Sequence, residues 1–453
     1  MSIQSALGAT ASLPRAFEDL LPDLRRSTKD IELIGTGEHD LGVLIDPRVV
    51  DVVLAHGAKY FEKGARTQYW RTAIGDGTGI RPPLQAQETG DPEIDISLAS
   101  WRRFRRRSMS EQFSAAKTPA YSAIAGQLAD DLCRRWIEAG QGELIADSRL
   151  VALDSFVACF AGPATRPELV AVSEQLWKSR IAAKLALDTP LACPFDRNLR
   201  RRDRARLLLQ AAVRPALAPL VKRVMVMERS FKSVVRSATE ASDDSIFSLL
   251  AQASGNYLSP IPAQTLPAQM QGLFIAGTET LSSALTWVLW HLSTDPALQD
   301  RINALPAAEA DALLRSSVYE SLRLHPPAWS IPREALADLK IGGTTIRKGT
   351  TLIASPLIQH YDAQVYDQPD QFVADRFVKP PRPSGSYFPF SLGPRTCPAM
   401  NHSVEHVFQI CRRVVRTVRL VCVEQPEGGL THWLGVDLGI TPGQRAVVQV
   451  EAR

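Results

Sequence analysis

The sequence lacks the features that mark several common classes of protein. Its first residues, Met1 to Asp23, contain no apolar run of the roughly 20 residues that are needed to cross a bilayer. No Gly/Ser-rich linker, low-complexity tract or internal repeat divides the chain. The formal net charge of its 453 residues is only +4, which is too small to indicate nucleic-acid binding. With 45% hydrophobic residues, we therefore expect a single domain, residues 1–453, that is cytoplasmic and has no membrane anchor.

Cysteine is scarce too, and its spacing excludes several metal centres. The chain has six cysteines, and none of them stands in a Cys-x-x-Cys pair, which argues against zinc ribbons and iron-sulfur clusters. The absence of a signal sequence favours reduced, mostly buried thiols. The six are Cys133, Cys159, Cys193, Cys397, Cys411 and Cys422.

One of these cysteines lies in a segment that predicts a metal ligand. Residues 390–399 read Phe-Ser-Leu-Gly-Pro-Arg-Thr-Cys-Pro-Ala. Gly393 permits a turn that is closed to residues with a Cβ atom, and Pro398 suits the first position of a helix that we predict over 398–418. A helix N-terminus favours an anion, so we expect the Cys397 thiol to ionise more readily than a free cysteine. A thiolate on a tight loop suits haem iron.

This loop resembles the cysteine-ligand signature of the cytochrome P450 family, Phe-x-x-Gly-x-Arg-x-Cys-x-Gly. The match covers Phe390, Gly393, Arg395 and Cys397, while Ala399 stands where the family usually has glycine. The resemblance implies haem b (iron protoporphyrin IX) as cofactor, with Cys397 as the ligand of its iron. It also implies that Phe390 shields the sulfur and that Arg395 lies near a haem propionate.

A second signature lies in a long, mostly apolar helical pattern from Pro267 to Leu292. Residues 276–280 read Ala-Gly-Thr-Glu-Thr. Glycine inside a helix costs about 1 kcal/mol relative to alanine, and the hydroxyl of Thr280 can bond the carbonyl of Ala276. We therefore expect an irregular turn that opens a groove. The segment resembles the family's Ala/Gly-Gly-x-Asp/Glu-Thr signature, which implies haem contacts for Ala276 and Gly277 and proton delivery by Glu279 and Thr280.

Two further patterns match the family. Glu320 and Arg323 share a helical face, and on their own they predict only a surface ion pair worth about 0 to 1 kcal/mol. Together with Arg376 they resemble a buried Glu-Arg-Arg network, to which we assign a structural role. Propionate contacts are implied for three more residues, although arginine-rich helices are usually just solvated: Trp101, Arg105 and Arg333.

A competing metal motif lies just beyond the cysteine loop. His402 to His406 read His-Ser-Val-Glu-His, which fits the His-x-x-Glu-His pattern of the inverzincin metalloproteases. Two histidines four apart can share a helical face. We interpret the motif as ordinary helix, because the cysteine signature already explains this stretch.

The fold that these patterns predict is mainly α with small peripheral β-sheets, the cytochrome P450 fold. We expect helices at 100–138, 167–187, 199–238 with a break at Pro215, 267–292, 307–324 and 398–418. Strands are expected at Leu339–Ile346, Thr351–Ser355, Arg419–Glu424 and Ala446–Val450.

The resemblance implies a haem-thiolate monooxygenase of the soluble bacterial type, which activates O2 with electrons from ferredoxin or flavodoxin and its reductase. Its substrate is expected to be a hydrophobic or aromatic small molecule of secondary metabolism. The residues that the family layout implies as lining of the substrate site are the loop Tyr69 to Ser97, Phe274, Ala276, Trp329 to Ile331 and Trp433-Leu434. Arg412, Arg413 and Arg416 suggest a basic face for an acidic redox partner, and the run Arg197 to Arg206 is either an exposed helix face or an anion site. The alternative function is a peroxide-dependent enzyme or a non-catalytic protein that binds haem or a ligand.

Overall fold

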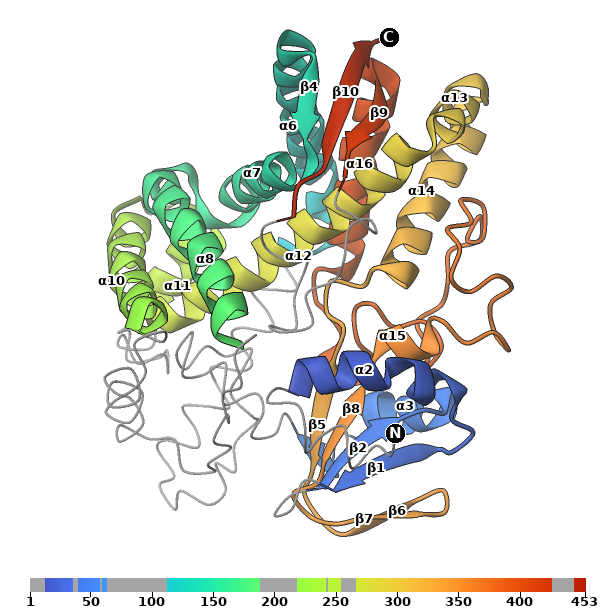
Figure 1. The fold of residues 1–453 in the computed structure, drawn as a ribbon. Coiled ribbons are helices and arrows are strands. Elements are labelled where there is room, and N and C mark those ends of the chain that lie inside the picture. Colours follow the sequence, from blue (N-terminus) through green and yellow to red (C-terminus); the bar gives the residue numbers. More distant parts are fainter. Residues whose placement is uncertain are drawn as a thin grey trace.

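A computed structural model describes residues 13–35, 40–57, 59–62, 112–187, 218–241, 243–253, 266–425 and 444–453 of the chain. In this part a group of helices stands beside a β-rich part, and α12 crosses the helical part (Figure 1). The expectation of a mainly helical fold with small sheets is confirmed. Among the helices of the described part, none combines the length and the apolar character that crossing a membrane requires.

The helical part is built around a core to which several helices contribute. Its main helices are α6 (Thr118–Ala139), α7 (Leu144–Phe156), α8 (Arg166–Leu187), α10 (Ala218–Ala241), α11 (Ile246–Ala253), α12 (Leu266–Thr294), α13 (Pro296–Ala304), α14 (Ala307–Leu324) and α16 (Met400–Thr417). α7 packs on α12, and α16 packs on α6. Leu285, Trp287 and Leu289 of α12 are buried in the same cluster as Phe408 and Cys411 of α16. Burial of one such apolar side chain contributes about 1.5–3 kcal/mol, so this shared core fixes α16 against α12.

Local signals explain where several of these helices begin and end. The Asp295 side chain accepts a hydrogen bond from the Leu298 amide (3.0 Å) and caps α13, which starts at Pro296. α14 ends at Leu324, directly before His325 and two prolines, because a residue that precedes proline is pushed out of the helical region. α7 continues into the π-helix η4 (Val157–Ala161), which ends at Gly162.

The β-rich part contains a five-stranded sheet in the order β1-β2-β8-β5-β3. β2 pairs in parallel with β8, and the other neighbours are antiparallel. Its strands are β1 (Ile31–Gly35), β2 (Asp40–Leu44), β8 (Thr351–Ala354), β5 (Ile331–Ala335) and β3 (Phe61–Glu62). Helix α2 (Leu13–Arg26) lies along this sheet (Figure 1) and buries Leu20 and Leu24 against Val43 and Ile353.

Two smaller sheets and several short helical turns complete the described part. β4 (Gln141–Glu143), β10 (Val447–Ala452) and β9 (Val418–Glu424) form a three-stranded sheet, and β6 (Leu339–Ile341) pairs with β7 (Thr344–Ile346). The short turns are α3 (Pro47–Asp51), η1 (Val52–His56), η3 (Ala115–Lys117), η5 (Pro163–Thr165), α15 (Pro356–Gln359) and η8 (Gly393–Arg395).

Most of the predicted elements that fall on described residues are present. The predicted helix at 307–324 has the observed bounds, and the helices predicted at 167–187 and 267–292 agree with α8 and α12 to within two residues at each end. The single strand predicted over 339–346 is instead a hairpin, because Gly342 takes a positive φ of 55° and reverses the chain. The stretches 100–111 and 199–217 of two other predicted helices lie outside the described residues.

Candidate functional site

The loop that carries Cys397 is closed by its own backbone. The Cys397 amide donates a hydrogen bond to the Phe390 carbonyl (2.9 Å), and the Thr396 amide donates to the Gly393 carbonyl (3.0 Å). Two residues of the loop have positive φ values, 65° at Ser391 and 66° at Gly393. Backbone of this kind is costly for residues other than glycine and is concentrated at functional sites. The loop therefore presents Cys397 from a tight, defined turn, as predicted.

Gly393 is needed for a second reason, which is contact with another part of the chain. A Cβ atom at this position would lie 2.5 Å from Ala55 Cα and 2.6 Å from the Leu54 carbonyl oxygen. Both of these atoms belong to the π-helix η1, on which the η8 turn of the loop packs. The close approach of two backbones thus fixes the loop against η1.

The expected easier ionisation of Cys397 is wrong for the protein chain alone. Burial raises the pKa of the Cys397 thiol above its usual value of 9.0, although a hydrogen bond from the Ala399 backbone acts in the opposite direction. The helix predicted over 398–418 is present as α16, but it begins at Met400, so the helix end lies two residues further from the sulfur than expected. A metal ion at the sulfur is what favours a thiolate in such surroundings.

The second signature places a small, open face on α12. Ala276 is exposed and Thr280, one turn later, is half-buried, whereas most of the helix beyond them is buried. The Thr280 hydroxyl donates to the Ala276 carbonyl (2.6 Å), as predicted. Glu279 is 5% exposed. This face offers space and a hydroxyl group in the middle of a core helix.

Two expectations about α12 are not met. The helix runs without interruption from Leu266 to Thr294, so no irregular turn breaks it. A Cβ atom at Gly277 would lie 2.6 Å from Cδ2 of Phe156, so this glycine permits close packing of α7 instead of opening a groove. Phe274 is fully buried, with its ring centroid 5.5 Å from that of Phe156, and belongs to the core instead of lining a substrate site. The same holds for Trp329, which is 1% exposed.

Two arginines fit the carboxylates of a bound group. Arg333 on β5 is 5% exposed, and its Nη1 donates to the Pro332 carbonyl (2.9 Å). Its Nη2 has no hydrogen-bond partner among the described residues, which is costly for a buried charge. Burial, and then the nearby charge of Arg395, lower the pKa of Arg333 to about 10. An anion beside both cations would satisfy the orphaned donor. The residues present therefore fit haem with its two propionates, while Trp101 and Arg105 lie outside the described residues.

The Glu320 network is buried and fully connected. Arg323 binds Glu320 through Nε (2.8 Å) with both side chains fully buried, and Arg376 Nε lies 3.0 Å from Glu320 Oε1. The Arg323 guanidinium also donates to the carbonyls of His360, Pro369 and Gln371. Because Arg323 donates to carbonyl groups of residues well beyond α14, the network joins this helix to the chain that leads to Cys397.

His360 extends this network and was missed by sequence reasoning. Its Nδ1 lies 2.9 Å from the Arg323 carbonyl, and its Nε2 accepts a hydrogen bond from the Phe388 amide (2.9 Å). Burial lowers the pKa of His360 to about 3, so the ring is neutral. The neutral ring bridges the end of α14 and the backbone two residues before Phe390. No local motif marks this histidine, and only its contacts reveal it.

The basic face expected on α16 is largely neutralised within the chain. Arg412 lies 2.8 Å from Asp311 and Arg416 lies 3.6 Å from the same carboxylate, while Arg413 pairs with Asp130. These arginines are therefore partly compensated, which weakens the expected attraction of an acidic partner. The run Arg197 to Arg206 lies outside the described residues.

Comparisons with known proteins show which proteins this chain resembles. Residues 223–436 match the sequence model of the cytochrome P450 family. The steroid 17-alpha-hydroxylase/17,20 lyase of Ovis aries is 32% identical over 181 residues, which are 36% of this chain and 35% of that protein. The cytokinin hydroxylase of Arabidopsis thaliana is 35% identical over 149 residues, 30% of this chain and 29% of that protein. The matching stretch thus spans about a third of the length of these curated relatives.

The likeness in fold covers nearly the whole chain. The structure of the retinoic acid bound cyanobacterial CYP120A1 superimposes with a TM-score of 0.72 over 95% of this chain and 94% of that one. The two sequences are 16% identical. At that level the comparison shows the shared fold.

Proposed function

We propose that this chain is a cytochrome P450, a haem-thiolate monooxygenase that oxidises a hydrophobic, ring-bearing small molecule; the match of residues 223–436 to the family's sequence model and the shared fold support this. The observation that carries the proposal is the Cys397 loop. Positive φ values at two positions, a closing hydrogen bond to Phe390 and the contact of Gly393 with η1 together present one sulfur atom in a fixed place. Such a loop would suit a single bond from the sulfur to a metal.

Haem is the cofactor that the family implies, and this chain has residues suited to it. We infer that Cys397 ligates the iron and that Arg333 and Arg395 hold the propionates, for which the orphaned Nη2 of Arg333 is the support. Haem with a thiolate ligand supplies the redox chemistry by which dioxygen is split. Phe390, which is half-buried beside the core, would keep water from the sulfur and so tune that chemistry.

Thr280 and Glu279 are proposed to deliver protons. The Thr280 hydroxyl donates its own hydrogen to the Ala276 carbonyl, so its oxygen is left with lone pairs that can accept a hydrogen bond from water on the open side of α12. Glu279 is buried and adjacent in sequence, and its carboxyl group is proposed to exchange protons with such a water. Ala276 leaves room at this point because its side chain is a single methyl group.

The open face of α12 favours an apolar substrate. Leu273 and Leu281, which flank Ala276 and Thr280 on this side, are partly buried hydrophobic residues. The relatives named above act on a steroid and a cytokinin, and CYP120A1 was solved with retinoic acid. A substrate of this kind, in secondary metabolism, is our proposal for this chain, with electrons from a ferredoxin or flavodoxin and its reductase.

The test combines a spectrum with turnover by the haem-loaded protein. In the reduced protein with carbon monoxide we expect the shifted absorption band of a thiolate-ligated haem, and Cys397→Ser should lose it. A wild-type protein without that band would refute the haem-thiolate assignment. Turnover with a surrogate ferredoxin and its reductase, compared with turnover on peroxide and with binding alone, separates the monooxygenase from the two alternatives.

A matched pair of variants tests the role of Thr280. Thr280→Ala should consume oxygen without forming an equivalent amount of product, because the proton-delivering hydroxyl is gone. Thr286 makes the same bond to the carbonyl one turn back (2.7 Å to Ser282) but is 1% exposed, so Thr286→Ala should keep oxygen use and product formation coupled. Equal coupling in both variants would remove the proposed role.

A further inference from the structure

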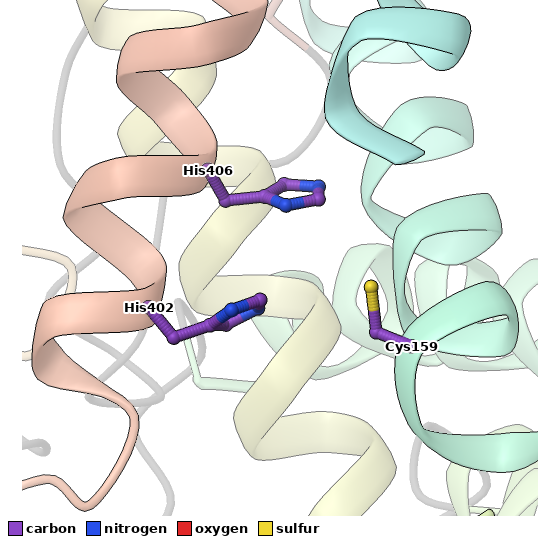
Figure 2. Close-up of side chains that lie close together, drawn as sticks. All are labelled: Cys159, His402 and His406. Atoms are coloured by element: carbon purple, nitrogen blue, oxygen red, sulfur yellow. The ribbon is translucent and has the colours of Figure 1, made fainter. Parts of the chain in front are cut away.

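Three metal-binding side chains converge at a place that the Cys397 site does not use. Cys159 Sγ and one ring nitrogen each of His402 and His406 lie within 4.8 Å of one another. Figure 2 shows the two imidazole rings extending from α16 toward the Cys159 sulfur on η4 across from them. Cysteine and histidine are the preferred ligands of zinc.

The local backbone explains why these side chains meet. His402 and His406 are one turn apart on α16, so their side chains lie on the same face of the helix. Cys159 lies in the π-helical end of α7, and π-helical turns are often found at functional sites. The three donors thus come from two elements that are anchored in the core independently of any metal.

His406 offers the strongest sign that a ligand is missing. It is 1% exposed, and its Nε2 lies 2.8 Å from the hydroxyl of Ser155, which is 2% exposed. Its Nδ1 has no hydrogen-bond partner among the described residues. In metal sites a ligating histidine usually donates its other ring N–H to a fixed oxygen, which orients the ring and leaves the lone pair for the metal. Ser155 is placed to accept that N–H, which leaves Nδ1 to bind.

The surroundings favour retention of a bound ion. Three aromatic rings pack around His402, with centroid distances of 5.8 Å to Phe113, 4.7 Å to Tyr121 and 5.1 Å to Phe160. They keep bulk water from the donors. His402 itself is half-buried, which leaves a path for an ion to enter. Burial lowers the pKa values of His402 and His406 to about 4 and about 3, so both rings are neutral, the form that binds metals.

We propose that Cys159, His402 and His406 form a binding site for one zinc ion, separate from the haem site. Zinc bonds of about 2.3 Å to sulfur and about 2.0–2.1 Å to nitrogen place tetrahedral ligand atoms about 3.3–3.7 Å apart. The donors therefore have to approach by at most about 1 Å on binding, which rotation of the side chains can supply. The Cys159 thiol loses its proton to solvent as the Zn–S bond forms, and no oxidation or reduction occurs. Water completes the fourth position.

This site is not that of a metalloprotease, although His-x-x-Glu-His suggested that class. A catalytic glutamate would have to face the metal. Glu405 instead pairs with Arg315 (2.6 Å) and accepts a hydrogen bond from Gln409 (2.7 Å). The Glu405 carboxylate thus binds these two side chains and not the metal. The site resembles a structural zinc centre that holds η4 against α16.

The experiment is zinc binding by the haem-loaded protein. After treatment with a chelator and desalting, the protein is titrated with zinc, and its zinc content is compared with its haem content. We expect one tightly bound zinc per chain in the wild type and none in Cys159→Ala or His402→Asn. Ser155→Ala should weaken zinc binding about 10- to 100-fold and not abolish it, because Ser155 orients the His406 ring but does not itself bind the metal. Zinc X-ray absorption should show one sulfur ligand and at least two nitrogen ligands, and haem iron does not interfere with it.

Controls distinguish this site from adventitious zinc. Cys422, which is partly exposed and outside the cluster, provides the matched thiol, and Cys422→Ser should bind zinc like the wild type. The zinc X-ray absorption measurement needs only the wild-type protein. It therefore tests the proposal even if a variant with a substitution at a buried position fails to fold. Zinc without a sulfur ligand, binding that survives loss of Cys159, or no tight binding at all would each overturn the proposal.

Discussion

Gly393 has two separate reasons to lack a side chain. Its φ of 66° lies in the left-handed region, and its Cα faces the backbone of Ala55 at a distance that leaves no room for another carbon. The glycine therefore determines both the turn of the loop and how closely it packs on η1. Either the positive φ or the close approach would disfavour alanine at this position. Together they fix the loop and therefore the position of the Cys397 sulfur.

We expect Gly393→Ala to destabilise the protein and to reduce haem retention. The positive φ alone costs a residue with a Cβ about 1–3 kcal/mol, and the overlap with η1 adds to this. Chemical denaturation and the haem content after purification are the measurements. Gly126, in α6, has no atom within 4 Å of an added Cβ, so Gly126→Ala should instead stabilise by about 0.5–1 kcal/mol. A loss of stability in both Gly393→Ala and Gly126→Ala would mean that the destabilisation does not come from the geometry of the loop.

At the scale of elements, α14 anchors a long irregular segment through buried charge. Glu320 and Arg323 have no exposure, and the carbonyls to which Arg323 donates belong to residues well after the helix. A buried pair of this kind contributes little over an apolar one, but its disruption is costly because a charge is left unpaired.

Arg323→Met should lower the free energy of unfolding by about 3–5 kcal/mol, since Glu320 then keeps only Arg376 as a charged partner and three backbone carbonyls lose their donor. The comparison is Arg301→Met, which removes an ion pair with Asp375 (3.2 Å) whose side chains are about half exposed. That variant should cost about 0–1 kcal/mol. Urea denaturation of both variants is the measurement, and similar small losses would show that the network is not needed for stability.

Which elements could be predicted from the sequence depends on how they are buried. α14 was predicted because it buries one face and ends at two prolines. α7 was missed: most of its residues are buried, so it lacks the one-sided pattern that marks an amphipathic helix. The Cys397 loop is local in sequence and was recognised. The contacts of Gly393 with η1, of His360 with Phe388 and of Cys159 with α16 join distant segments, and no spacing in the sequence announces them.

For the whole molecule, buried histidines determine the response to acid. Burial lowers the pKa values of His291 and His360 to about 3, against about 6.5 for an exposed histidine. As the pH falls below about 6.5, the unfolded chain binds protons that the folded one cannot, so the free energy of unfolding falls.

Each of these two histidines should contribute up to about 1.4 kcal/mol per pH unit between pH 6.5 and about 4.5. Denaturation curves at several pH values measure this slope. Carboxyl groups with lowered pKa values, such as those of Asp46 and Glu405, lose their contribution only at lower pH. His360→Gln should reduce the slope by one proton, whereas His56→Gln, at an exposed position, serves as the control. An unchanged slope in His360→Gln would contradict the assignment.

The chain from 361 to 392 contains neither helix nor strand, yet its carbonyls and amides are held by Arg323, Arg376 and His360. Repeating hydrogen bonds tolerate a shift of register, but contacts to individual carbonyl groups do not. Insertion or deletion of even one residue in this segment would shift its carbonyl and amide groups away from Arg323, Arg376 and His360. The Cys397 sulfur, which follows the segment, would then be displaced. The length of this segment is therefore as tightly constrained as the identity of its side chains, in contrast to an ordinary surface loop, which can grow or shrink freely.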